Sequence, residues 1–143
     1  MKKVILVLCV IFACANTAIA QVTVSRSDLV GTKWQLSVDY VSQSSEFYEF
    51  TKKTLIWHRE DGRTGSPPFY YLSNKIPDKF DSKKVGVTTN GCYLNKYLDE
   101  KHFTCYAITI FDKSKGKMVL ELKNEKFIGP NKPITFIRID KKK

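Results

Sequence analysis

Glycine, proline, cysteine and histidine are all scarce in this sequence. Its 143 residues include seven glycines and five prolines, which excludes collagen-like repeats and Gly/Pro-rich disordered chains. Four cysteines are too few for a small domain held together mainly by disulfides. The two histidines, His58 and His102, and the absence of a Cys-x-x-Cys pair give no metal-ligand pattern. We therefore expect no metal and no cofactor, and the length indicates one domain.

The motifs of the common enzyme classes are also missing. The sequence holds no Ser/His/Asp order, no nucleophile elbow and no Gly-rich phosphate loop. His58 lies next to Glu60 and Asp61, and these residues could form an acid–base pair, but such residues at the end of a strand are typical of plain surface. We predict that the protein is not an enzyme.

The first 20 residues have the features of a secretory signal peptide. Lys2 and Lys3 precede an apolar stretch over 4–13, and Ala18-Ile19-Ala20 is a small-residue cleavage site before Gln21. The apolar stretch is too short for a membrane span, and no other stretch approaches one. Cleavage after Ala20 predicts a mature domain over 21–143.

One alternative to this cleavage remains open. The sequence 11–14, which ends at Cys14, loosely resembles a bacterial lipobox, in which the cysteine would be lipidated and retained. The bulky Phe12 fits that motif less well than the alanines fit a cleavage site. Either route predicts export to the bacterial periplasm or the exterior.

Export changes the meaning of the charge. Removing Lys2 and Lys3 lowers the formal charge from +10 to +8, and an exported chain does not meet nucleic acid. A basic surface instead favours acidic envelope surfaces or acidic proteins. Lysines in solvated turns that keep the chain soluble are the simpler interpretation. We expect a monomer with no nucleic-acid partner.

Two of the four cysteines, Cys92 and Cys105, lie in the mature chain. An oxidising compartment permits one intramolecular disulfide between them, which would stabilise the fold by about 3 kcal/mol. Two buried free thiols are the alternative.

Alternation of apolar and polar residues predicts β-strands throughout the mature chain. Residues 34–40, 46–51, 54–59, 69–72, 103–111, 118–122 and 134–139 each have the composition or period of a strand. Asn90-Gly91 between two apolar segments predicts a hairpin turn joining 85–89 to 92–94, and a second turn is expected near 99–101. A helical turn is expected only at 27–30, with Ser27 as its cap. Eight or nine short strands indicate an antiparallel up-and-down β-barrel.

The segment Asp28-Leu29-Val30-Gly31-Thr32-Lys33-Trp34 resembles the opening of a lipocalin-like (calycin) barrel, in which a helical turn leads to a glycine and a tryptophan on the first strand. Here the spacing is Gly31-x-x-Trp34, one residue longer than the lipocalin Gly-x-Trp. Residues 47–50, 106–108, 118–122 and 136–139 match later features of short bacterial members in order, so the resemblance covers most of a core over 28–139, followed by a basic tail at 140–143.

The resemblance implies a structural role for three residues. Gly31 and Trp34 would close one end of the barrel, and the guanidinium of Arg138 would lie over the indole ring of Trp34. Such a cation–π contact is worth about 0.5–2 kcal/mol. This pairing concerns the fold and carries no information on a ligand.

Two functions fit an exported barrel. The first is binding of a small hydrophobic or amphipathic molecule inside the barrel; the second is a protein-interaction or inhibitor module with a basic surface and a solidly packed interior. The candidate cavity residues are Tyr40, Phe50, Trp57, Tyr71, Tyr106, Leu120 and Phe136. Each of them could equally be packed core, and the hydroxyls of Tyr40, Tyr71 and Tyr106 could orient a polar group of the ligand.

Overall fold

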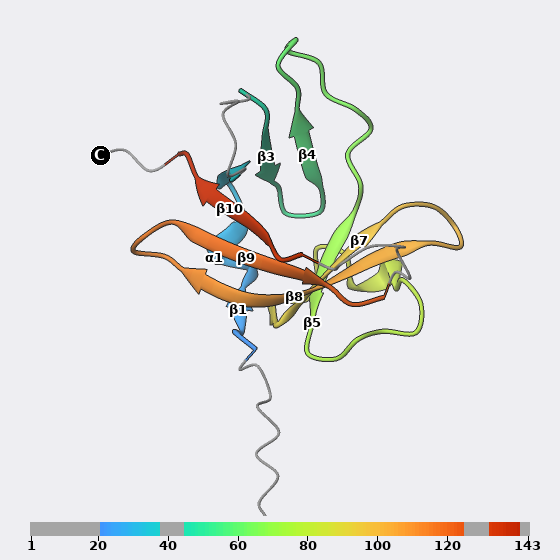
Figure 1. The fold of residues 1–143 in the computed structure, drawn as a ribbon. Helices are drawn as coiled ribbons and strands as arrows, with labels where there is room; N and C mark the ends of the chain where they lie inside the picture. Colours follow the sequence, from blue (N-terminus) through green and yellow to red (C-terminus); the bar gives the residue numbers. More distant parts are fainter. Residues whose placement is uncertain (1–20, 38–44, 125–131, 141–143) are drawn as a thin grey trace, which may run out of the picture.

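The structure is a computed structural model that describes residues 21–37, 45–124 and 132–140. Strands dominate these residues, and the helical elements are two single turns (Figure 1). The strands are β1 (Val24–Ser25), β2 (Lys33–Leu36), β3 (Phe47–Phe50), β4 (Leu55–His58), β5 (Tyr70–Ser73), β6 (Asn90–Gly91), β7 (Tyr93–Tyr97), β8 (Phe103–Asp112), β9 (Lys117–Leu122) and β10 (Ile134–Arg138). The helical turns are α1 (Arg26–Leu29) and the 3-10 turn η1 (Ser82–Lys84).

Eight of these strands form a nearly closed antiparallel barrel. Their order in the sheet is β4-β3-β2-β10-β9-β8-β7-β5, so most neighbours are consecutive in the chain and the topology is up-and-down. The two edge strands meet at a short seam, where Thr54 bridges Phe69 and the Leu55 amide donates to the Pro68 carbonyl at 3.0 Å. The predicted all-β barrel with one short helical turn is confirmed.

Strand alternation places large apolar side chains on the inner face of the barrel. Trp34, Phe50, Leu94, Ile108 and Leu120 belong to one core cluster and are each at most 4% exposed. Burial of a side chain of this size contributes about 1.5–3 kcal/mol relative to exposure. The inner face is therefore the main source of stability.

The segment before β2 packs against one end of this core. Val24 and Leu29 are buried in the same cluster as Trp34. Gly31 ends the α1 turn with φ +78°, a left-handed conformation that favours glycine. The buried indole N–H of Trp34 donates to the Thr32 hydroxyl at 2.6 Å, so the ring is buried without an unpaired donor.

The hairpin predicted at Asn90-Gly91 is wrong. Residues 85–87 form a turn, residues 88–89 have no regular structure, and Asn90-Gly91 is the short strand β6, which pairs with β1. Glycine is required there because a Cβ at Gly91 would lie 2.5 Å from the backbone nitrogen and oxygen of Ser73. The residue permits a close approach of two backbones, and it does not supply a positive φ to a turn.

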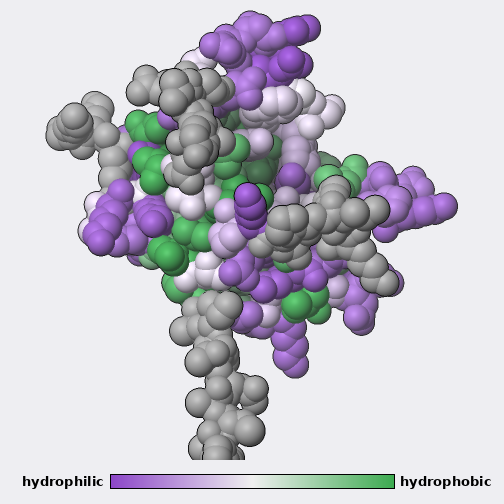
Figure 2. Space-filling view, viewed as in Figure 1, coloured by the Kyte–Doolittle hydropathy of each residue, from purple (hydrophilic) through white to green (hydrophobic). Residues whose placement is uncertain are grey.

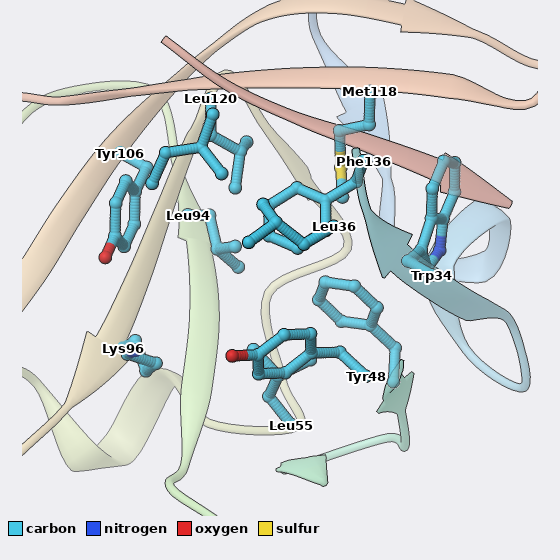
Figure 3. Close-up of a pocket in the computed structure, with 12 residues that line it drawn as sticks. Trp34, Leu36, Tyr48, Leu55, Leu94, Lys96, Tyr106, Met118, Leu120 and Phe136 are labelled. Carbon is cyan, nitrogen blue, oxygen red and sulfur yellow. The ribbon is translucent and has the colours of Figure 1, made fainter. Parts of the chain in front are cut away.

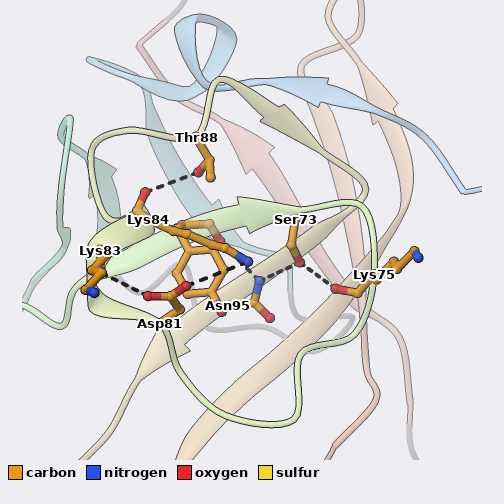
Figure 4. Close-up of polar contacts among 8 residues, drawn as sticks. Ser73, Lys75, Asp81, Lys83, Lys84, Thr88 and Asn95 are labelled. Atoms are coloured by element: carbon orange, nitrogen blue, oxygen red, sulfur yellow. Dashed lines mark hydrogen bonds and ion pairs between the residues drawn. The ribbon is translucent and has the colours of Figure 1, made fainter.

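A covering loop, residues 74–89, crosses the outer face of β5, β7 and β8. Its Phe80 ring packs against Tyr71, Tyr97 and Phe103, one from each of these strands. Figure 4 shows polar contacts of this region: the Asp81 carboxylate caps η1 by accepting from the Lys83 amide at 3.1 Å. Side chains under the loop are therefore buried on the outer side of the sheet.

Hydrophilic side chains gather at the periphery in Figure 2, including the loop that follows β4 at the top of the view, with apolar patches between them. Within the described residues, no helix combines the length and the hydropathy needed to cross a bilayer.

Candidate functional site

The barrel interior contains a cavity of about 150 Å³ (Figure 3). Its walls come from every barrel strand except β5, so the cavity lies on the barrel axis. Among the described residues the lining is mostly apolar, and its polar groups are the Trp34 indole N–H, the hydroxyls of Tyr48 and Tyr106 and the ammonium group of Lys96. The lining residues are Trp34, Leu36, Tyr48, Phe50, Leu55, Leu94, Lys96, Tyr106, Met118, Leu120, Ile134 and Phe136.

The cavity has a buried end and an accessible end. Trp34 and Met118 are each 1% exposed at the buried end, whereas Leu36 is 43% exposed. In Figure 3 the Tyr48 and Tyr106 hydroxyls and Lys96 lie on the side of the cavity away from Trp34. The polarity of the lining therefore changes along the cavity, from apolar at Trp34 to polar at Lys96.

The polar end is electrostatically distinct. Burial raises the pKa of the Tyr48 phenol, and the nearby Glu46 and Tyr106 raise it further. The Lys96 ammonium nitrogen lies 5.9 Å from the centroid of the Tyr106 ring. Lys96 is the one charged side chain among the cavity residues given above.

Four of the residues predicted as cavity lining face this cavity: Phe50, Tyr106, Leu120 and Phe136. Trp57 does not line it. It is 38% exposed and stacks at 6.5 Å on Tyr48, directly across β3 and β4. Trp57 therefore extends the aromatic wall of Tyr48 beyond the cavity.

Tyr71 lies on the other side of the sheet. Its ring packs against Phe80 of the covering loop and is 1% exposed. Three consecutive β5 residues, Tyr70, Tyr71 and Leu72, are all buried, so alternation could not assign Tyr71 to a face. Tyr40 lies outside the described residues.

Several residues that line the cavity were not predicted from the sequence. For two of them, the alternation of the strand indicated the inner face. Tyr48 has the same parity as Phe50 in β3, and Lys96 has the same parity as Leu94 in β7, so each pair shares a face. Alternation alone would therefore place both side chains on the inner face. A lysine in an apolar strand is nevertheless expected to face solvent, because the sequence does not show that Lys96 lies near the end of the barrel.

The predicted closure residues lie at the buried end. Arg138 of β10 is directly opposite Trp34 of β2. Its guanidinium makes two hydrogen bonds to the Asp140 carboxylate, of 2.8 and 3.1 Å. Arg138 and Trp34 are not joined by any of the cation–π contacts found among the described residues. The ion pair with Asp140, two residues after the end of β10, thus replaces the implied contact between guanidinium and indole.

The disulfide predicted between Cys92 and Cys105 is not formed, and both residues are buried free thiols. The reason is the register of β7 and β8. The Ile108 amide donates to the Cys92 carbonyl at 2.8 Å, whereas Cys105 pairs with Asn95. The two cysteines are therefore offset by three residues, roughly 10 Å along the strands, while a disulfide needs Cα atoms about 4.4–6.8 Å apart.

Each histidine contacts a carboxylate outside the barrel cavity. His58 Nε2 lies 2.8 Å from Glu49, and the imidazole stacks on Phe47. His102 Nδ1 lies 2.8 Å from Asp99 in an exposed turn. This second pair borders an outer groove that also contains Ser82, but no hydrogen bond links Ser82 to His102 in the described structure. No group of three potential metal ligands occurs among the described residues.

Comparison with protein-family models, with curated proteins and with solved structures gives no match for this chain.

Proposed function

We propose that the protein binds a small apolar or amphipathic molecule inside its barrel. The observation that carries this proposal is the cavity on the barrel axis, with an aromatic and aliphatic lining and one accessible end. An apolar cavity of this volume holds a benzene-sized molecule. A barrel packed solidly by its own side chains would leave no such space.

The lipocalin-like resemblance is part of the same proposal. An up-and-down barrel with a helical turn, Gly31 and Trp34 at its buried end supports it, and export would place the protein in the bacterial envelope or exterior. We propose that this function is binding without catalysis.

Titration with toluene tests the proposal, because toluene matches the size of the cavity and carries no polar group. We expect chemical-shift changes at cavity residues such as Leu120 and a dissociation constant of roughly 0.1–1 mM. Leu120→Phe fills the cavity and is expected to weaken binding at least about tenfold. The matched control is Ile110→Phe, which adds the same ring at a position 42% exposed to solvent. Absence of toluene binding to the folded protein, or unchanged binding by Leu120→Phe, would overturn the proposal.

A further inference from the structure

We propose that the outside of the barrel carries a second binding site, formed around Arg26 and Lys52, which takes a phosphate ion or the phosphate group of a phosphomonoester. The site is an open pocket between α1, the turn that joins β3 to β4 and the residue before β6. It shares no residue with the barrel cavity, so it does not depend on the proposed function. The lining residues are Ser25, Arg26, Ser27, Val30, Lys52 and Thr89.

Main-chain hydrogen bonds hold the walls of this pocket together. The Arg26 amide donates to the Thr89 carbonyl at 2.7 Å, which fixes α1 to the segment before β6. The Gly31 amide, after α1, donates to the Phe50 carbonyl at 2.7 Å, two residues before Lys52. The pocket is therefore formed by the fold itself, and an anion would bind there with little additional ordering of the chain.

The pocket contains two positive charges and, among its described lining residues, no carboxylate. Neither Arg26 nor Lys52 belongs to any of the ion pairs found among the described residues. The one acidic residue of α1, Asp28, pairs with Lys113 at 2.8 Å instead. The charges of Arg26 and Lys52 are therefore left for a bound anion, which would form charge-assisted hydrogen bonds with both.

The guanidinium group of Arg26 is only partly hydrated. Its Nη1 atom is buried and has no hydrogen-bond partner within the described structure. Burial raises the pKa of the neighbouring Tyr70 to about 12, and the charge of Arg26 acts against that rise. A cation that has lost hydration without gaining a counter-ion is unfavourable. An oxyanion in the pocket is the kind of group that would compensate this charge.

The hydroxyl groups of the pocket indicate which oxyanion fits. Ser25 Oγ and Ser27 Oγ lie 2.8 Å apart, and Thr89 contributes a third hydroxyl. A phosphomonoester carries a charge of about −1.5 to −2 at pH 7 and three strong acceptor oxygens. A carboxylate carries one negative charge and two oxygens. Two cations with several neutral donors therefore match a phosphate group better than they match a carboxylate.

The experiment is an NMR titration of the full protein with inorganic phosphate at pH 7.5 and constant ionic strength, with acetate as the comparison. We expect saturable shift changes at the amides of Ser25, Arg26 and Ser27, with a dissociation constant on the order of 1 mM. Acetate should bind at least about fivefold more weakly. Lys52→Met is expected to weaken phosphate binding about three- to tenfold, whereas Lys52→Arg should retain it.

The matched control is Lys101→Met, which removes the same charge from an exposed turn that does not line the pocket. It should change the dissociation constant of phosphate by less than about twofold. Arg26→Gln should abolish saturable binding; should that variant not fold, the exposed position Lys52 carries the test. Absence of saturable binding, equal binding of acetate, or equal weakening by Lys101→Met and Lys52→Met would overturn the proposal.

A second arm distinguishes a lipid headgroup from a soluble phosphate. The protein is mixed with phosphatidylcholine vesicles that either contain or lack phosphatidate. Binding to phosphatidate that phosphate displaces and Lys52→Met weakens would support the site on a lipid headgroup, and phosphate binding without vesicle binding would support it for a soluble phosphomonoester. Toluene binding should be the same in Lys52→Met and in the unmodified protein, so a failure of this site and a failure of the cavity are separate results.

Discussion

Single residues in this barrel act through contacts that lie far from them in the sequence. The two mature-chain cysteines differ in their surroundings although both are buried. Cys92 is 8% exposed and its thiol donates to the Gln21 side chain at 3.3 Å, whereas Cys105 is fully buried. Burial, together with the proximity of Cys92, raises the pKa of Cys105 to about 11. The nucleophilic thiolate is therefore scarce at Cys105.

The first prediction concerns these thiols. At pH 8 roughly one Cys105 side chain in a thousand is ionised, so we expect a thiol reagent to modify Cys92 at least about tenfold faster in the native protein. The single variants Cys92→Ser and Cys105→Ser assign the two rates, and in urea both cysteines should react rapidly. Equal native rates, or an intact mass 2 Da lower (about the mass of two hydrogens) that shows a disulfide, would contradict the prediction.

The second prediction concerns Gly91. A methyl group at this position would lie 2.5 Å from the Ser73 backbone, which cannot move away like a flexible side chain. We expect Gly91→Ala to lower the free energy of unfolding by about 2–4 kcal/mol. Gly65→Ala is the control, because a Cβ at Gly65 meets no atom within 4 Å. Similar urea midpoints for the two variants would exclude the close backbone approach.

At the scale of elements, β10 completes the barrel by pairing with both β2 and β9. Its C-terminal end is held by the Arg138–Asp140 ion pair, and the Asp140 carboxylate also accepts from the Lys33 amide of β2 at 3.2 Å. The Arg138 guanidinium lowers the pKa of Asp140, and the Lys33 amide lowers it further. One carboxylate therefore joins β10 to β2, the pair of strands that brings the two ends of the barrel sequence together.

The third prediction follows from the sign of this pKa shift. A carboxyl group whose folded-state pKa is lowered stabilises the fold above its unfolded pKa, about 3.9, and this contribution is lost as the pH falls. Between pH 6 and pH 3, the free energy of unfolding of the unmodified protein should fall by about 1 kcal/mol more than that of the Asp140→Asn variant. Urea titrations at each pH measure this difference, with the exposed-site variant Asp78→Asn as control. Parallel pH profiles for the protein and Asp140→Asn would show that the ion pair contributes nothing.

At the scale of the whole molecule, the segment just before β1 packs against the barrel. The Val22 amide donates to the Ile108 carbonyl at 3.1 Å, and Val24 is buried in the core. Residues 22 and 24 are therefore part of the folded domain among the described residues.

The fourth prediction tests the cleavage after Ala20 that the sequence predicts. Expressed at full length in a bacterium, the protein should appear in the envelope or medium with the intact mass of residues 21–143. Lipidation at Cys14 would instead give a chain that begins at residue 14 and carries acyl mass. A mass that includes residues 1–20 in the exported fraction would contradict both routes.

The sequence predicted the barrel well because its strands alternate and its turns are local. It failed where the deciding contact was distant. Asn90-Gly91 has the composition of a hairpin turn, but the constraint on Gly91 comes from Ser73. Tyr71 looks like a cavity residue until the covering loop buries the outer face of β5. Lys96 was missed because a charged residue in a strand indicates solvent unless its place in the barrel is known.

The pairing of β2 with β10 has a consequence for biogenesis. Residues about a hundred positions apart must meet before the sheet is complete, with Arg138 opposite Trp34. Contacts of such long sequence separation form late and slowly. A nascent chain that lacks β10 leaves β2 and β9 as open edges, so the barrel cannot close until almost the entire polypeptide has been synthesised. Until β10 is made, the chain therefore stays incompletely folded, which is the state that the export predicted from the sequence would require.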